Sequence, residues 1–151
     1  MPKKSKKYIT RSKKETQKLA KSLAKSVFKI KNSKNALVLA LEGELGSGKT
    51  TFTQGFANGL GIKEKILSPT FVILKRFQFV KPKKFKNFFH VDCYRIIKPE
   101  ELLELNWRKI IYNPENIVMI EWADLVKKFL PKGVIKIKFE FINEKNRKIT
   151  F

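Results

Sequence analysis

One stretch decides the fold: Ala36-Leu-Val-Leu-Ala-Leu-Glu-Gly-Glu-Leu-Gly-Ser-Gly-Lys-Thr50. Its first six residues are apolar on both faces of an extended chain, which is typical of a buried central strand. A glycine-rich segment follows directly, and Phe52, Phe56 and Leu60 then recur at every fourth position. That period predicts an amphipathic helix. The predicted order is therefore strand, glycine-rich loop, helix.

The glycine-rich segment from Gly43 to Thr50 matches the pattern G-x-x-x-x-G-K-[ST] in full, in the strand-to-helix context that the pattern requires. Its glycines allow the backbone to wrap a phosphate, so that consecutive amides and the positive end of the helix dipole point at the anion. The pattern assigns Lys49 to the β- and γ-phosphates and the Thr50 hydroxyl to magnesium. The sequence thus predicts a site for ATP or GTP with Mg²⁺, and a glycine turn without a ligand is the weaker interpretation.

A magnesium–nucleotide site also needs a carboxylate near the metal, and two acids stand at the ends of apolar strands. Glu121 follows Ile117–Ile120, and Asp92 follows a second apolar run that contains His90. Spacing alone does not rank the two acids, and each has a plainer interpretation as a solvated acid at a strand end. His90 is predicted to be a packed or hydrogen-bonded strand residue, and Cys93 a small buried side chain.

The other elements are predicted from caps, periods and strand patterns. The segment Ser12–Glu15 has a capping-box pattern, which starts a helix. This helix has one apolar stripe for packing on a sheet, formed by Leu19, Leu23, Val27 and Ile30 with Ala20 and Ala24 beside them. Two β-rich runs, Phe71–Val80 and Phe85–Asp92, are predicted to pair antiparallel. Further expected elements are a helix that starts at Pro99, a short helix over Ala123–Phe129, and an edge hairpin of Val134–Phe141 with Arg147–Phe151.

Length and composition bound the organisation of the chain. With 151 residues, of which 42% are hydrophobic, the chain can bury one core, and we expect a single domain over residues 12–151 after a basic tail at 1–11. The longest apolar run is far shorter than the roughly 20 residues of a membrane-spanning helix. One cysteine cannot form an intramolecular disulfide, which fits a reducing compartment. A soluble, cytoplasmic protein is expected.

The net charge of +21 is the strongest compositional feature. A charge of this size is typical of proteins that contact nucleic acid or another polyanion. The same excess of Lys, Phe, Ile and Asn is also what an AT-rich genome imposes on any protein, so the charge leaves both interpretations open. Residues 1–34 contain 13 of the 34 Lys and Arg and one acid, Glu15. The charge is therefore spread over the chain but is densest at the N-terminus.

Five motifs, taken together, resemble those of one family. They are Gly-Glu-Leu-Gly-Ser-Gly-Lys-Thr-Thr-Phe from Gly43, Ser-Pro-Thr-Phe from Ser68, His-x-Asp-x-Tyr-Arg from His90, Pro-Glu-Glu-Leu from Pro99 and Glu-Trp from Glu121. In this order and spacing, over residues 12–147, they resemble the TsaE (YjeE) family of bacterial ATPases. Five linked motifs are far more specific than one phosphate-loop pattern.

The resemblance implies a function in tRNA modification. The family takes part in forming threonylcarbamoyladenosine (t6A) at position 37 of tRNAs that read codons starting with A. Its members bind the transferase TsaD with the partner protein TsaB and do not transfer the group themselves. ATP binding and hydrolysis reset that complex between turnovers, so contact with tRNA is expected to be indirect, through the complex.

The resemblance also implies roles for individual residues. Thr50 and Glu121 are the implied magnesium ligands, Asp92 orients or activates the attacking water, and Thr70 is a switch residue near the γ-phosphate. Lys49 stabilises charge on the transferring phosphoryl group. The implied nucleotide cradle consists of Gly43, Gly46, Ser47, Gly48, Lys49, Thr50 and Thr51.

Other positions match the family less specifically. The start of the first helix near Ser12 and the last strand near Arg147 are implied to approach the nucleotide base. Trp122 is a core residue by default, and the resemblance implies a contact near the active site or a partner. The family commonly has a glycine about where Asn106 stands, so the chain departs from it at that turn.

The predicted fold class is α/β: a P-loop NTPase three-layer α/β/α sandwich whose mostly parallel sheet is antiparallel at one edge. Slow hydrolysis of ATP is expected, because no arginine finger can be named and a partner would complete the site. Two alternatives remain. A small-molecule kinase would need an acceptor pocket and a lid with arginines. A tRNA-binding module with a regulatory nucleotide would show steeply salt-dependent tRNA binding by the isolated chain.

Overall fold

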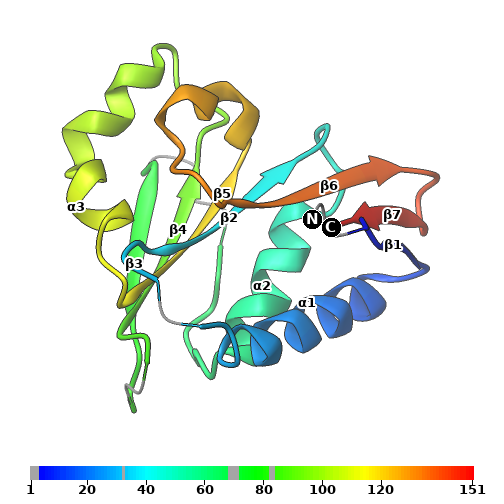
Figure 1. Ribbon diagram of the computed structural model, residues 1–151. Helices are drawn as coiled ribbons and strands as arrows, with labels where there is room; N and C mark the ends of the chain where they lie inside the picture. The colour runs from blue at the N-terminus through cyan, green and yellow to red at the C-terminus, as the bar shows by residue number, and fades with distance from the viewer. Residues whose placement is uncertain (1–3, 32, 68–71, 82–83) are drawn as a thin grey trace.

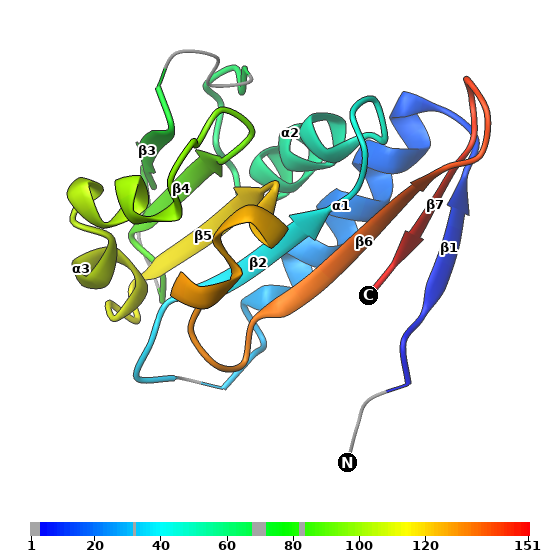
Figure 2. The same cartoon turned by 90° about the horizontal axis from the view of Figure 1, so that it is seen from above.

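The chain forms a seven-stranded mixed sheet with helices on both faces (Figures 1 and 2). The computed structural model describes residues 4–31, 33–67, 72–81 and 84–151. The strand order is β1-β7-β6-β2-β5-β4-β3. The strands are β1 (Lys7–Thr10), β2 (Leu37–Glu42), β3 (Leu74–Gln78), β4 (Asn87–Asp92), β5 (Asn116–Glu121), β6 (Ile135–Phe141) and β7 (Arg147–Thr150).

The predicted α/β/α sandwich with parallel strands at its centre is confirmed. Strands β6, β2, β5 and β4 are parallel neighbours, while β3 pairs antiparallel with β4. At the opposite edge β7 and β1 are antiparallel as well, so both edges are antiparallel rather than one. The helices are α1 (Lys13–Val27), α2 (Lys49–Gly59), η1 (Pro99–Leu105), α3 (Trp107–Ile111) and η2 (Ala123–Phe129), of which η1 and η2 are 3₁₀ helices.

The helices are divided between the two faces of the sheet. Figures 1 and 2 show α1 and α2 side by side on one face and α3 on the other. Alternation along β2 serves both layers, because Leu39 and Leu41 pack towards α1 and α2 while Val38 and Ala40 pack in the other cluster, with Trp107. Buried apolar residues on both faces confirm that β2 is a central strand.

The expected basic tail at residues 1–11 is wrong in part, because the sheet includes some of these residues. Strand β1 pairs antiparallel with β7, and the Lys6 and Phe151 backbones exchange two hydrogen bonds of 2.7 and 3.0 Å. Tyr8 also stacks on Phe151, with ring centroids 5.1 Å apart. Sequence analysis assigned this strand to the tail because of its lysines. An edge strand, however, needs few apolar residues and often carries lysines. The hairpin of β6 and β7 is consequently internal, with β1 at the edge.

Helix α1 starts at the predicted cap. The Ser12 hydroxyl accepts a hydrogen bond from the Glu15 amide at 3.1 Å, and the Glu15 carboxylate accepts one from the Arg11 amide at 2.6 Å. Within the predicted apolar stripe, Ala20, Ala24 and Val27 are fully buried, whereas Leu19 and Leu23 are only partly buried. The fourth predicted member of the stripe, Ile30, lies beyond the helix and is exposed.

The greater depth of the two alanines follows from close packing between α1 and α2. A Cβ atom at Gly55 would lie 2.4 Å from the Gln17 carbonyl oxygen, and one at Gly59 would lie 2.7 Å from the Ala24 Cβ. Two glycines at this spacing form a flat surface on α2, against which the small residues of α1 pack. Larger side chains at these positions would separate the helices.

Asn106 lies between η1 and α3 with φ of 58°, in the left-handed region. Asparagine tolerates this region better than most residues, which explains how the chain keeps the turn where the resemblance leads to a glycine. Within the described residues, every helix is too short or too polar to span a bilayer.

We predict that Gly55→Val lowers the free energy of unfolding by about 1–3 kcal/mol, because the added side chain overlaps the backbone of α1. Chemical denaturation followed by circular dichroism measures the change. The matched control is Asn58→Val, an exposed position on the same helix, which should stay within about 0.5 kcal/mol of the wild type. Equal effects of the two substitutions would contradict the close packing of the helices.

Candidate functional site

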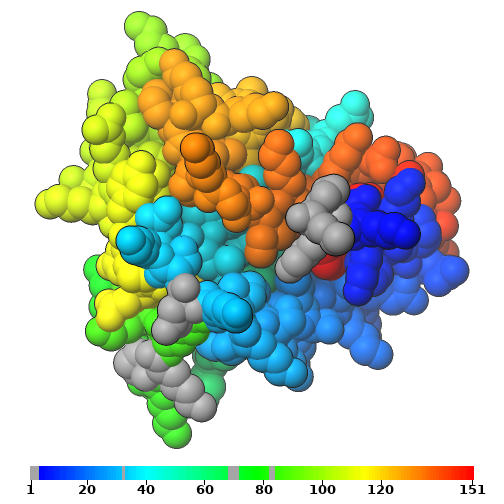
Figure 3. Space-filling model, in the orientation of Figure 1, coloured from blue at the N-terminus to red at the C-terminus, as the bar shows by residue number. Residues whose placement is uncertain are grey.

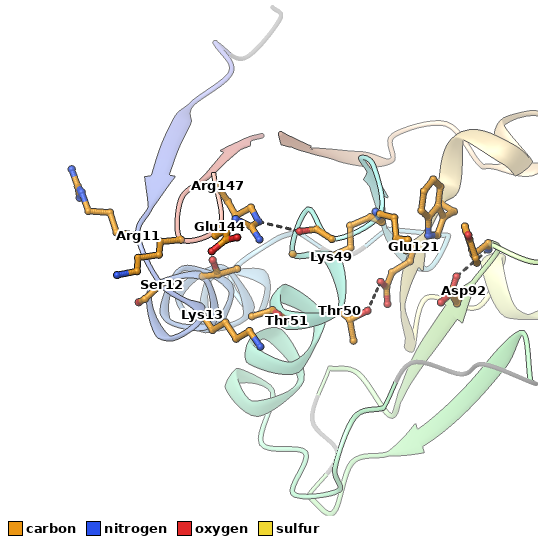
Figure 4. Close-up of a pocket in the computed structure, with 17 residues that line it drawn as sticks. Arg11, Ser12, Lys13, Lys49, Thr50, Thr51, Asp92, Glu121, Glu144 and Arg147 are labelled. Atoms are coloured by element: carbon orange, nitrogen blue, oxygen red, sulfur yellow. Dashed lines mark hydrogen bonds between the residues drawn. The ribbon is translucent and has the colours of Figure 1, made fainter. Parts of the chain in front are cut away.

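A pocket of about 810 Å³ opens at the carboxyl ends of β2, β4 and β5 (Figure 4). The glycine-rich loop and the first turn of α2 form its floor. The start of α1 and the β6–β7 hairpin form one end, and Asp92, Glu121 and Trp122 form the other. Ligands of open α/β sheets bind at this edge of the sheet. The pocket therefore lies where the sequence analysis expects the nucleotide.

The glycine-rich loop depends on glycine at two positions. A Cβ atom at Gly43 would lie 2.7 Å from the Phe139 carbonyl oxygen and 2.8 Å from the Ser47 hydroxyl oxygen, so the loop passes close to β6. Gly48 is the N-cap of α2 and has φ of 99°, which a side chain disfavours. The loop therefore enters α2 by a turn that leaves the first amides of the helix without intrahelical partners.

Lys49 folds back over the loop from the first position of α2. Its ammonium group donates hydrogen bonds to the carbonyl oxygens of Gly43 at 2.6 Å and Glu44 at 2.8 Å, and to the Ser47 hydroxyl at 3.3 Å. The side chain also lies over the Trp122 ring, 4.1 Å from its centroid. Among the described residues, the ammonium group of Lys49 thus donates hydrogen bonds to neutral oxygens and contacts one aromatic ring.

The environment of Lys49 favours an anion. Burial lowers the pKa of Lys49 below its usual range, and the charges of Glu121, Asp92 and Asp124 oppose that shift only in part. The residue is 5% exposed. Because burial disfavours the charged form, a negatively charged ligand in the pocket would stabilise the ammonium group and raise the pKa. The loop thus holds a partly desolvated cation at the place assigned to phosphates.

The structure brings together the two residues implied as magnesium ligands. The Thr50 hydroxyl donates a hydrogen bond of 2.8 Å to Glu121 Oε1 (Figure 4). The second carboxylate oxygen, Oε2, is hydrogen-bonded to Nε2 of His90, which is buried like Glu121. The prediction of a hydrogen-bonded His90 is confirmed. His90 and Thr50 together fix the orientation of the Glu121 carboxylate.

Asp92 lies beside Glu121 at the ends of two parallel strands. The two residues are register partners on β4 and β5. The Asp92 carboxylate accepts a hydrogen bond from the Tyr94 amide at 3.0 Å and lines the pocket. Contact with Thr50 distinguishes Glu121 from Asp92, which spacing alone could not do.

The donor set fits magnesium held together with phosphates. Hydroxyl and carboxylate oxygens are ligands that Mg²⁺ accepts, and it retains water and phosphate oxygens in nucleotide sites. Among the described residues, no group of three or more His, Cys, Asp and Glu is arranged to hold a metal by itself. Thr50 and Glu121 therefore suit an ion that arrives with a nucleotide rather than a permanent metal centre.

Trp122 adopts a backbone conformation that is unusual for its type. Its φ is 58°, in the left-handed region, and its ring packs against Tyr94 with centroids 4.9 Å apart. Strain of this kind costs of order 1–3 kcal/mol and is concentrated at functional sites. The indole lies over Lys49 and is also partly buried against the core cluster that contains Trp107, so the default interpretation as a core residue holds in part.

The remaining predicted residues are placed as follows. Gly46, Gly48 and Thr51 line the pocket, whereas Ser47 is buried beneath the loop. Thr70 lies outside the described residues. Its role remains a prediction.

The far end of the pocket was only loosely predicted. Arg147 Nε donates a hydrogen bond of 3.2 Å to the Gly46 carbonyl oxygen, and its guanidinium lies 4.6 Å from the centroid of the Phe141 ring. Lys13 and Glu144 also line this end and were not proposed from sequence. Lys13 lies within the capping box of α1 and Glu144 lies between β6 and β7, and no sequence motif assigns either residue to a nucleotide site.

The fold and the site define an α/β protein with a phosphate-loop sequence motif at the carboxyl ends of its central parallel strands. The family model described as "Threonylcarbamoyl adenosine biosynthesis protein TsaE" matches residues 10–149. The chain therefore belongs to the TsaE family of tRNA threonylcarbamoyladenosine biosynthesis.

Individual relatives and a solved structure agree with this assignment. The TsaE protein of Bacillus subtilis is 40% identical over 115 residues, which cover 76% of this chain and 68% of the relative. That of Rickettsia prowazekii is 36% identical over 137 residues, which cover 90% and 87%. The crystal structure of Bacillus subtilis YdiB superposes with a TM-score of 0.72 at 33% identity and covers 98% of this chain and 84% of that chain.

We predict that the thiol of Cys93, the residue after Asp92, is inert in the folded protein. The side chain is fully buried, and burial together with Asp92 and Asp124 raises its pKa to about 12. The reactive thiolate is thus rare at pH 8, and its fraction grows only as the pH rises towards 12. Alkylation by iodoacetamide at pH 8 should be at least about 100-fold slower than that of free cysteine.

Unfolding in guanidinium provides the control, because the single cysteine should then react at the rate of a free thiol. Rapid labelling of the native protein would show that the end of β4 opens readily beside the pocket, against this prediction.

Proposed function

We propose that this chain binds ATP with Mg²⁺ in the cytoplasm and hydrolyses it to ADP and phosphate, as the ATP-dependent component of t6A formation. The observation that carries the proposal is the hydrogen bond of 2.8 Å between Thr50, in the first turn of α2, and Glu121, at the end of β5. The partly desolvated ammonium group belongs to Lys49, the residue before Thr50. A hydroxyl, a carboxylate and a cation in this arrangement match the needs of a magnesium–triphosphate. Membership of the TsaE family supports the process in which it acts.

Each group has a defined part in this proposal. The amides of the loop and the dipole of α2 would bind the phosphates, and Lys49 would exchange its carbonyl partners for phosphate oxygens. Thr50 and Glu121 would hold the magnesium ion, which supplies charge neutralisation on the phosphates. His90 keeps the Glu121 carboxylate in position through its hydrogen bond to Oε2. Binding thus uses groups that are already in place.

Asp92 is the group proposed to orient or deprotonate the attacking water. Its carboxylate lines the same pocket and is anchored by the Tyr94 amide. As the register partner of Glu121, Asp92 lies next to the proposed metal ligand and therefore near the proposed position of the phosphates. Thr70 is proposed to sense the γ-phosphate on the strength of the family motif alone.

The proposed partners are the TsaD and TsaB proteins, which would complete the catalytic site. Catalysts of phosphoryl transfer gain large rate factors from an arginine placed on the transferring group. The one arginine that contacts the glycine-rich loop in the described structure is Arg147, and it bonds the Gly46 carbonyl oxygen at the end of the pocket away from Asp92 and Glu121. A weak ATPase that is stimulated by its partners is the consequence.

We predict that Glu121→Gln and Asp92→Asn each lower partner-stimulated ATP hydrolysis by about 100-fold or more, the scale of loss when a group that stabilises the transition state is removed. Phosphate release from the full chain, with and without purified TsaD and TsaB, measures the rate. Glu104→Gln, at an exposed position on η1, is the matched control and should leave the rate unchanged. Chelation of Mg²⁺ should abolish the activity of all variants.

Three results would contradict the proposal or a part of it. Hydrolysis that survives both site substitutions would remove Glu121 and Asp92 from the mechanism. Transfer of phosphate to a small molecule instead of water would favour the kinase alternative. A full rate without TsaD and TsaB, and no binding to them, would leave the nucleotide site but remove the proposed partnership.

A further inference from the structure

The outer surface of α1 carries a line of four lysines, Lys14, Lys18, Lys21 and Lys25, which we call the α1 lysine face. Spacings of four, three and four residues keep these side chains on one side of the helix. All four are exposed. The buried residues of α1, such as Ala20, point to the opposite side, so the lysines form the outermost line of the helix. In Figure 3, α1 runs in blue along the lower edge of the molecule.

Among the residues that the structure describes, no acid forms an ion pair with the α1 lysine face. Elsewhere lysines have partners, for example Lys86 with Glu115 at 2.6 Å and Lys148 with Glu140 at 3.4 Å. Within the described residues, no ion pair includes a member of the α1 lysine face. The charges of this face therefore remain available to a ligand.

The sequence of α1 supplies only one acidic residue to offset the charge of these lysines. The only acid on α1 is Glu15, and its carboxylate accepts a hydrogen bond from the Arg11 amide at the cap. Lysines at spacings of three and four repel one another and lower the stability of a helix, whereas solvated helical faces commonly alternate the two signs. Packing of the opposite side against α2 offsets that repulsion. A repeating anion would remove it.

The structure argues against a membrane as the repeating anion. An interfacial helix inserts its apolar side between lipids. The apolar side of α1 is not available, because Ala20, Ala24 and Val27 are fully buried in the core. The face therefore offers charge alone. Lysines contact phosphates as compact point charges and lack the planar fork with which arginines recognise phosphates and base edges.

We propose that the α1 lysine face binds the phosphate backbone of RNA without base specificity. A single straight line of exposed cations suits an anion that repeats along a chain, and the TsaE family acts in tRNA modification. The proposed RNA binding does not depend on the proposed ATPase activity, because none of the four lysines lines the nucleotide pocket. It starts one residue after Lys13, which does line the pocket, so RNA bound there would lie next to the nucleotide site.

The test compares three variants of the full chain in binding to an unmodified tRNA transcript, measured by fluorescence anisotropy over a series of salt concentrations. The first replaces the α1 lysine face by glutamine. The second, a control of equal charge loss, replaces four exposed lysines of the opposite layer by glutamine. The third replaces the α1 lysine face by arginine, which retains the charge. The control positions are Lys98, Lys109, Lys127 and Lys132.

We expect the α1 glutamine variant to bind tRNA at least about tenfold more weakly than the wild type. Its slope of log K against log salt should be shallower by about three units, since each lost phosphate contact removes 0.7–0.9 of a unit. The control and arginine variants should bind like the wild type. Circular dichroism and ATP hydrolysis of each variant show whether folding and the nucleotide site are intact, so failure of this inference is distinguishable from failure of the proposed ATPase.

Three outcomes would overturn the inference. Equal loss in the α1 and control variants would show that net charge alone attracts tRNA, as composition drift predicts. Absence of tRNA binding by the wild type at low salt would remove the interaction altogether. Binding to vesicles of anionic lipid that depends on these four lysines, without binding to tRNA, would assign the face to membranes instead.

Discussion

The parallel pairing of β2, β5 and β4 is the constraint on which the site depends. Parallel strands end at the same edge of a sheet, and the register sets Leu41 opposite Glu121 and Glu121 opposite Asp92. The glycine-rich loop leaves β2 two residues later, and α2 returns over the same edge. A one-residue slip of β5 would turn Glu121 to the other face, away from Thr50. The buried apolar residues of β5 fix the register and thereby the contact between Thr50 and Glu121.

That constraint is also what sequence analysis lacked. The glycine-rich loop and the strand before it were predictable, because G-x-x-x-x-G-K-[ST] and a two-sided apolar run are local patterns. Spacing left the choice between Glu121 and Asp92 open, since both follow apolar strands. The family resemblance favoured Glu121, and only the strand order shows how this residue meets Thr50. Strand β1 was not predicted, because it is stabilised by pairing with β7, which is distant in sequence, rather than by a pattern in its own residues.

The buried charge of Lys49 makes the glycine-rich loop a favourable place for an anion. Lys49 is buried enough for its pKa to fall, yet its ammonium is held by oxygens that belong to the loop itself. Such a cation is stabilised by its neighbours but not fully compensated, so the binding of a phosphate improves its environment. The left-handed backbone at Trp122 belongs to the same arrangement, because it sets the indole over Lys49. Local strain is thereby coupled to the position of the buried Lys49 ammonium group.

Helix α1 combines a closely packed inner side with a positively charged outer side. Its inner side consists of small residues because Gly55 and Gly59 of α2 approach too closely for larger ones. Its outer side repels itself, so the helix depends on that tertiary packing more than on its own propensity. A helix under such repulsion is stable only while it is docked, and an anion on the outer side would strengthen the docked state. Charge and packing on α1 are therefore linked through folding, although they occupy opposite sides.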